Sequence, residues 1–177
     1  MKAILIIDMQ NDFSDFGTLP VKKSLELANR ISNLINSVKR DQFKILASLD
    51  YHPINHVSFN QFPVHCVAKT KGSEHIEPLN DFDYDLIIKK GTKKNMDNFS
   101  CFYNGKKESK LRKYLTKNNV TDIYVCGVAL DICVEATIKD LIKNNYNVFL
   151  FEDLSIPLDL SYVLELDKLT KINSSKI

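Results

Sequence analysis

A cysteine between a predicted strand and a predicted helix is the residue of this sequence with the clearest capacity for chemistry. The apolar, β-branched run 122–126 is typical of a buried strand, Gly127 interrupts it, and a helical pattern begins at Asp131. Cys133 therefore lies at a helix start, where unpaired N–H groups favour an anion and should make the thiol easier to ionise. The same N–H groups can hold the oxyanion formed when a thiolate attacks a carbonyl. The alternative is a small buried apolar residue, the commoner role of a free cysteine.

Two further predicted strands end in ionisable side chains. The apolar run 3–7 ends at Asp8, and the run 86–88 ends at Lys89 and Lys90. In an open parallel α/β sheet, the reaction crevice lies at the carboxyl ends of the strands. Asp8 is therefore a candidate acid or base, and a helix cap or a turn is the other interpretation. In a chain this rich in lysine, only position favours a role for the lysines.

An aspartate and three histidines follow the second predicted strand. Asp50 ends the run 43–49, His52 comes two residues later, and His56 and His65 lie in the irregular segment after it. Carboxylate oxygen and imidazole nitrogen are common ligands of divalent metals. Three of the four histidines of the chain lie here, and this crowding favours a metal site over scattered loop residues.

The elements that must position these groups alternate between strands and helices. Strands are predicted at 3–8, 43–49, 84–89, 122–126 and 148–151, and helices at 25–38, 111–117 and 131–143. This alternation predicts a three-layer α/β fold with a largely parallel sheet of five or six strands and helices on both faces. The tail is predicted to hold a short helix at 160–166 and a last strand at 169–172. The fourth histidine, His75, is predicted to be an exposed loop residue.

Composition narrows the class of protein. The length of 177 residues predicts a single domain, residues 1–177, and the net charge of +2 argues against nucleic acid or an anionic membrane as a partner. We find no apolar run long enough to span a membrane, no signal peptide and no glycine-rich nucleotide motif. The four cysteines have neither zinc-finger spacing nor a dense disulfide pattern, so we expect reduced thiols and a cytoplasmic location.

Five separated segments, in collinear order, resemble the isochorismatase-like cysteine hydrolase superfamily, and within it most closely the nicotinamidases, also called pyrazinamidases. The match extends from Ala3 to about Asp153, and the tail beyond is poorly matched. The segments are Asp8–Phe13, Asp50–Pro53 with His56–Phe59, Pro63–Val67, Lys89–Thr92 and Cys126–Val134. Five motifs in order are far more specific than any one of them.

The resemblance implies a catalytic set of Cys133 as nucleophile, Asp8 as its base and Lys90 as the third member. It implies that the backbone N–H groups of Ala129 and Cys133 form the oxyanion hole, with a non-proline cis peptide before Ala129. It also implies that Phe13 stacks on the substrate ring.

The resemblance further implies a divalent metal, zinc or else iron or manganese, held by Asp50, His52 and His65. His56 matches a position that ligates in some members and not in others. Tyr51 stands where many relatives have tryptophan, so it is expected in the aromatic wall of the substrate pocket.

The implied activity is hydrolysis of nicotinamide to nicotinate and ammonia through a Cys133 thioester, in NAD salvage. The alternatives are another amidase of the superfamily, acting on a ureido, carbamoyl or different aromatic amide, and a non-catalytic metal-binding module on the same fold. Relatives are often dimers or larger, so a homo-oligomer is an open expectation.

Overall fold

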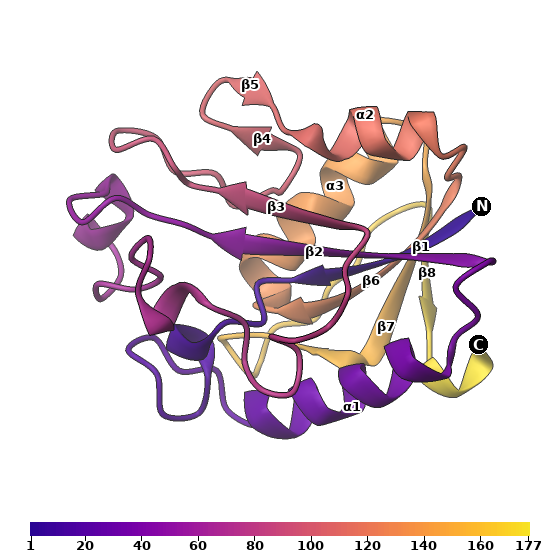
Figure 1. The fold of residues 1–177 in the computed structure, drawn as a ribbon, viewed down its shortest axis with the longest axis horizontal. Coiled ribbons are helices and arrows are strands. Elements are labelled where there is room, and N and C mark those ends of the chain that lie inside the picture. Colours follow the sequence, from indigo (N-terminus) through magenta and orange to yellow (C-terminus); the bar gives the residue numbers. More distant parts are fainter.

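A six-stranded parallel sheet forms the centre of the computed structural model, which describes residues 1–177 (Figure 1). The strand order is β3-β2-β1-β6-β7-β8. The strands are β1 (Lys2–Ile7), β2 (Phe43–Asp50), β3 (Leu86–Lys90), β6 (Asp122–Val128), β7 (Asn147–Ile156) and β8 (Leu169–Ile172). Every neighbouring pair is parallel. The predicted fold class is confirmed, with six strands.

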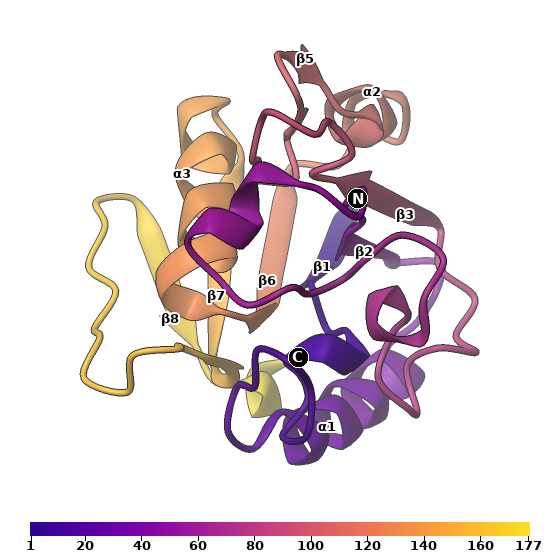
Figure 2. The ribbon, with the colours of Figure 1, turned by 90° about the vertical axis from the view of Figure 1, so that its left-hand side faces the viewer.

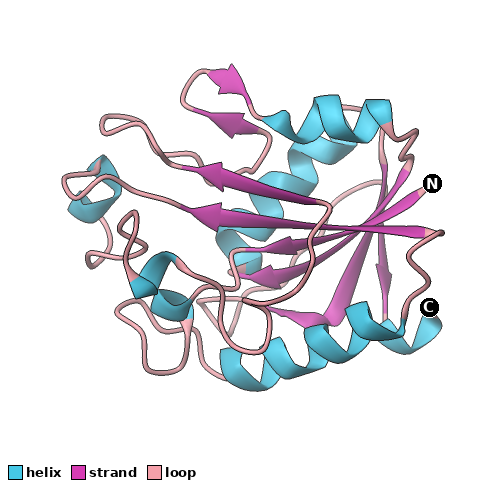
Figure 3. Ribbon diagram, in the orientation of Figure 1, coloured by secondary structure: helices cyan, strands magenta, loops and turns pink.

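Helices cover both faces of this sheet (Figure 3). Helix α1 (Ser24–Ser37) lies on one face, and α2 (Lys110–Lys117) and α3 (Glu135–Lys143) lie on the other. Because side chains alternate along a strand, β1 contributes Ile4 and Ile6 to the core under α1, and Leu5 and Ile7 to the core under α2 and α3. A small hairpin, β4 (Tyr103–Asn104) and β5 (Lys107–Glu108), precedes α2. No helix combines the length and the apolar character needed to cross a membrane.

The order of the strands reverses between β1 and β6, and this topological switch point positions the site. From β1 the chain proceeds outward to β2 and β3, then returns to β6 on the other side of β1. Crevices in open parallel sheets form at such a point, beyond the carboxyl ends of the strands. Figure 2 faces this edge, where the long connections after β1, β2 and β7 gather.

The tail between β7 and β8 differs from the prediction. The strand at 169–172 is confirmed as β8, but residues 160–166 form turns and irregular chain instead of a helix. Leu160, Val163 and Leu164 would share one face of that helix, yet the first two are 66% and 67% exposed and only the third is buried. Without a buried apolar face, so short a helix is not stable.

Candidate active site

A fully buried lysine is the centre of the site. The Nζ atom of Lys90, the last residue of β3, lies 2.8 Å from Asp8 Oδ2 and 2.6 Å from Asp50 Oδ1, and 3.4 Å from Cys133 Sγ. Lys90 and Asp8 are both 0% exposed. A buried charge is tolerated when it is paired and hydrogen-bonded, and here one ammonium faces two carboxylates. The four side chains that follow or end β1, β2, β3 and β6 thus meet at one point.

Asp8 is held at the end of β1 by close packing of the two central strands. Its φ of 49° is in the left-handed region, which aspartate tolerates better than most residues. Its Oδ1 accepts a hydrogen bond of 2.7 Å from Ser48 Oγ on β2. On β6, a Cβ at Gly127 would lie 2.2 Å from the Ile7 carbonyl oxygen, so only glycine lets the strands approach this closely beside Asp8.

Cys133 lies in a π-helical turn, Leu130–Val134, that leads into α3. The carbonyl of Ala129 accepts hydrogen bonds from the N–H groups of Ile132 and Val134 at 3.1 and 3.2 Å, and these bonds close the turn. The peptide bond between Val128 and Ala129 is cis, which confirms the expectation drawn from the resemblance. Cys133 is 6% exposed, so its sulfur meets the buried charges of the site instead of solvent.

Burial dominates the protonation equilibria of these groups. It raises the pKa of the Cys133 thiol well above the usual value, although the Lys90 charge opposes the shift. The expected easier ionisation at a helix start is therefore wrong for the resting protein. Burial also raises the pKa of Asp8 against the opposing charge of Lys90. For Asp50, burial alone would raise the pKa, but Lys90 holds it well below the usual range.

Gln10 is a site residue that the sequence reasoning missed. Its side-chain amide donates to the Asp50 carbonyl at 2.8 Å and accepts from the Asp50 N–H at 2.7 Å. A second donation, of 3.1 Å, goes to the Ser73 carbonyl. Because Gln10 is fully buried, this amide fixes the backbone of Asp50 relative to the β1 end. Only its place two residues after Asp8 could have pointed to it.

The residues beside Lys90 fit a divalent cation. One ligand atom each from Asp50, His52 and His65 lies within 4.8 Å of the others. The Nδ1 atoms of His52 and His65 lie 3.0 Å from the Gly91 carbonyl and 2.7 Å from the Pro63 carbonyl, so both can donate there and leave Nε2 free. His52 Nε2 is buried without a hydrogen-bond partner, and an orphaned acceptor next to a carboxylate is what a metal would satisfy.

His56 lies beside this group with both ring nitrogens engaged. Its Nδ1 accepts from the Ser58 N–H at 3.2 Å, and its Nε2 lies 3.1 Å from the Met96 carbonyl, where it donates. Its ring stacks on His52 with centroids 4.1 Å apart. His52, His56 and Asp97 also bring ligand atoms within 4.8 Å. Asp97, in a polar loop, was not among the predicted residues.

A mostly apolar pocket opens beside the sulfur. Phe13 is 8% exposed, and its ring centroid lies 5.6 Å from that of His65. Most of the other lining side chains are also apolar, which suits a flat aromatic molecule. The lining comprises Phe13, Leu19, Val21, Asp50, Ser58, Phe62, His65, Asp97, Phe99, Ala129, Ile132, Cys133 and Leu158.

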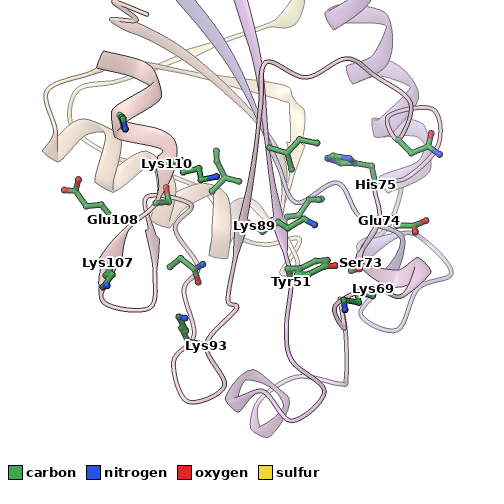
Figure 4. Close-up of a pocket in the computed structure, with 17 residues that line it drawn as sticks. Tyr51, Lys69, Ser73, Glu74, His75, Lys89, Lys93, Lys107, Glu108 and Lys110 are labelled. Carbon is green, nitrogen blue, oxygen red and sulfur yellow. The ribbon is translucent and has the colours of Figure 1, made fainter. Parts of the chain in front are cut away.

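Tyr51 is not brought to this pocket. It lines a separate open groove beside β3 (Figure 4) and is absent from the lining of the pocket, which includes Asp50. The Nζ atom of Lys89 lies 4.0 Å from the centre of its ring. Residues 50 and 52 face one way and residue 51 the other because side chains of an extended chain alternate.

His75 also lines the groove, and the prediction that it is exposed is wrong. It is 6% exposed, and its ring stacks on Tyr84 with centroids 4.8 Å apart. Burial lowers the pKa of His75 to about 4. The four histidines therefore divide between two places, with three next to Asp50 and the fourth on the groove side.

Comparisons with known proteins agree with this geometry. The Isochorismatase domain family matches residues 2–161. A nicotinamidase of Saccharomyces cerevisiae is 30% identical over 192 residues, which cover 89% of each chain. The crystal structure of a Pyrococcus horikoshii pyrazinamidase in complex with zinc superposes with a TM-score of 0.83 at 30% identity, covering 97% of this chain and 98% of that one. A structure from L. infantum in complex with nicotinate superposes with a TM-score of 0.83 at 30% identity, covering 97% of this chain and 96% of that one.

Proposed function

The chain belongs to the isochorismatase family, and from this premise we propose that it hydrolyses nicotinamide to nicotinate and ammonia. The observation that carries the proposal is the contact of Lys90 with Asp8, Asp50 and Cys133 beside an apolar pocket. The relatives support the substrate, since one is a nicotinamidase and another was solved with nicotinate. The product is a pyridine acid, as used in NAD salvage.

Attack on the amide begins with a proton transfer between neighbours. A carboxylate oxygen of Asp8 lies within 4.8 Å of the Cys133 sulfur, so Asp8 accepts the proton as the sulfur attacks the carboxamide carbon. Lys90 keeps its positive charge beside both groups and compensates the charge that moves from oxygen to sulfur. The N–H groups of Ala129 and Cys133 then hold the oxyanion, and one such donor contributes about 3–4 kcal/mol.

Collapse of this intermediate breaks the carbon–nitrogen bond. Asp8 returns the proton to the departing nitrogen, ammonia leaves, and the acyl group remains on Cys133 as a thioester. Asp8 then takes a proton from an incoming water, whose oxygen bonds to the acyl carbon. The carbon–sulfur bond breaks, the proton passes to the sulfur, and nicotinate is released. Each half-reaction thus uses the same base in both directions.

The ring of the substrate is positioned by the far side of the pocket. Phe13 offers a face for stacking at the position that the resemblance implies. A divalent cation such as zinc, held by Asp50, His52 and His65, would supply Lewis-acid chemistry at this end of the pocket. We assign three ligands, because the hydrogen bonds of His56 occupy both of its ring nitrogens.

Ammonia release from nicotinamide tests the proposal, with metal content measured on the same sample. Cys133→Ala should lower kcat by about 10⁴-fold or more, as the loss of a nucleophile does, and should keep the metal. Cys126→Ala is the matched control, because Cys126 is a buried thiol on β6 in the core under α1. Wild-type protein with bound metal and no activity on nicotinamide, or full activity in Cys133→Ala, would contradict the proposal.

We place this activity in the cytoplasm and in a single domain formed by residues 1–177. The four cysteines are all free and buried, which suits a reducing compartment. The two cores on either side of the sheet draw on residues from both ends of the chain, which supports one folding unit.

A further inference from the structure

The connection between β7 and β8 forms part of the catalytic pocket although it has no regular structure. This segment, residues 157–168, is here called the strap. Leu158 near its start lines the pocket together with Ile132 and Cys133. Leu164 is 2% exposed and anchors the strap in the core under α3. A wall residue on irregular chain needs something that holds it in place.

The side-chain carboxylate of Asp131 holds this part of the strap in place. Its Oδ1 accepts the N–H of Leu158 at 2.8 Å, and its Oδ2 accepts the N–H of Asp159 at 2.9 Å. Hydrogen bonds to an ionised carboxylate are stronger than those between neutral groups. Asp131 stands two residues before Cys133 in the same π-helical turn. One short segment therefore carries both the nucleophile and these two hydrogen bonds, which are here called the clasp.

A second acidic residue, one helical turn further on, also lies near the strap. Glu135 begins α3, and its carboxylate lies near Tyr162 of the strap. Burial together with this neighbouring carboxylate raises the pKa of Tyr162 to about 12. Within the strap, Asp159 accepts from the N–H and the hydroxyl of Ser161 and shapes a local turn. The hydrogen bonds to Asp131 therefore attach the strap to the turn that carries the nucleophile.

We propose that Asp131 is a positioning residue that sets substrate selection through Leu158. Its two hydrogen bonds hold Leu158 against the pocket, where this side chain limits the room for substituents on the ring of the bound amide. The favoured substrates are then unsubstituted six-membered heteroaromatic amides, and release of the clasp admits ring-methylated ones. The substrate half of this inference rests on the proposed function, whereas the clasp rests on the contacts alone.

Amide hydrogen exchange tests the clasp without any need for activity. In Asp131→Ala the amides of Leu158 and Asp159 lose their acceptor, and each should exchange roughly tenfold faster or more. Asp131→Asn keeps one acceptor oxygen and should give an intermediate effect. Asp140→Ala is the matched control, because it removes the same charge from α3 and its carboxylate makes none of these hydrogen bonds. Unchanged exchange at both amides in Asp131→Ala would overturn the clasp.

Steady-state kinetics on nicotinamide and on ring-methylated nicotinamides test the selection. Asp131→Ala should raise KM for nicotinamide about tenfold with kcat nearly unchanged, and should narrow the preference for the unsubstituted ring. A loss confined to kcat, or an unchanged preference, would overturn the positioning role. A wild type without activity on any amide would overturn the proposed function and with it the substrate half, while the exchange rates would still decide the clasp.

Discussion

The ends of β2 and β3 support two hollows with opposite character. On one side Asp50 and Lys90 are buried and paired next to the sulfur of Cys133, in a pocket of about 40 Å³. On the other side Tyr51 and Lys89, their immediate neighbours in sequence, line an open groove of about 950 Å³ (Figure 4). The groove carries six lysines against two glutamates. One residue of sequence therefore separates an enclosed charged centre from a solvated surface.

This contrast teaches that neither the size nor the charge of a hollow identifies a catalytic centre. The lysines of the groove lie in solvent, where a charge is hydrated and needs no partner. In the small pocket, each charge depends on another, because removing it from water is costly. Groups held under that constraint have shifted pKa values, as catalysis requires. Three of the four predictions below compare a residue of the buried side with a residue of the groove side.

Replacing the buried lysine should have the largest effect. Lys90→Met leaves Asp8 and Asp50 together without a cation, so the free energy of unfolding should fall by about 3–5 kcal/mol. Hydrolysis should fall to the background rate, because the thiolate loses its counter-charge. Urea unfolding and ammonia release measure the two effects.

The matched change is Lys89→Met, which removes the same charge one residue earlier on β3. Lys89 is exposed and contacts the ring of Tyr51, so its loss should change the free energy of unfolding by no more than about 0.5 kcal/mol. Similar losses of unfolding free energy in Lys90→Met and Lys89→Met would mean that burial does not distinguish the pocket side of β3 from the groove side.

Metal binding should separate the histidines in the same way. His52→Ala removes the orphaned Nε2 beside Asp50, so zinc affinity should fall by more than about 100-fold, beyond the loss typical of an outer-sphere change. His75→Phe, on the groove side, should leave zinc affinity within a factor of about two, since His75 is in none of the ligand groups. Chelator competition on the purified proteins measures both, and strong zinc binding by His52→Ala would refute the assignment.

The pH dependence of the free energy of unfolding should show the lowered pKa of His75, the histidine that lines the groove. Its pKa is about 4 in the folded protein against 6.5 for the free side chain, so between these values the unfolded chain binds a proton that the folded protein does not. The contribution of neutral His75 is complete above pH 6.5 and is lost as pH falls toward 4, a span of about 3 kcal/mol. Urea unfolding at pH 7 and pH 4 should show a correspondingly smaller loss in His75→Phe, which keeps the stacking on Tyr84. Equal losses in both proteins would rule out this linkage.

Local pattern brings the inner groups together because each of them ends or follows a strand, whereas the roles of Lys90 and His65 were assigned only by resemblance. Asp8, Asp50 and Lys90 follow apolar runs, and Cys133 follows the run 122–126, so the topology alone brings them to one edge. The burial of Lys90, and the burial of the Cys133 thiol that raises the pKa of this thiol, could not be read from the sequence, because both depend on contacts across four strands.

Loop residues failed where their partners are distant. His75 is buried against the ring of Tyr84, nine residues later in the chain, and no periodic pattern in the sequence predicts this contact. The side chains of Gln10 and Asp131 form hydrogen bonds with backbone groups 40 and 27 residues away. The sequence near either residue gives no sign of such distant partners. Tyr51 was grouped with the pocket through resemblance, although the alternation of side chains after Asp50 already placed it on the other side.

Substitution of the two aromatic residues should have the smallest effect and separate the two sides most finely. Phe13→Leu removes a stacking face from the pocket, and an aromatic pair contributes about 0.5–1.5 kcal/mol beyond its buried area, so KM for nicotinamide should rise up to about tenfold with kcat little changed. Tyr51→Leu, in the groove, should change KM by less than about twofold. Both variants replace an aromatic ring by leucine. The ratio of their KM values therefore measures the effect of where the ring lies, separately from the effect of the change in residue type. A rise in KM for Tyr51→Leu equal to that for Phe13→Leu would mean that the ring of Tyr51 reaches the substrate, and that the two sides of the β2 end serve one site.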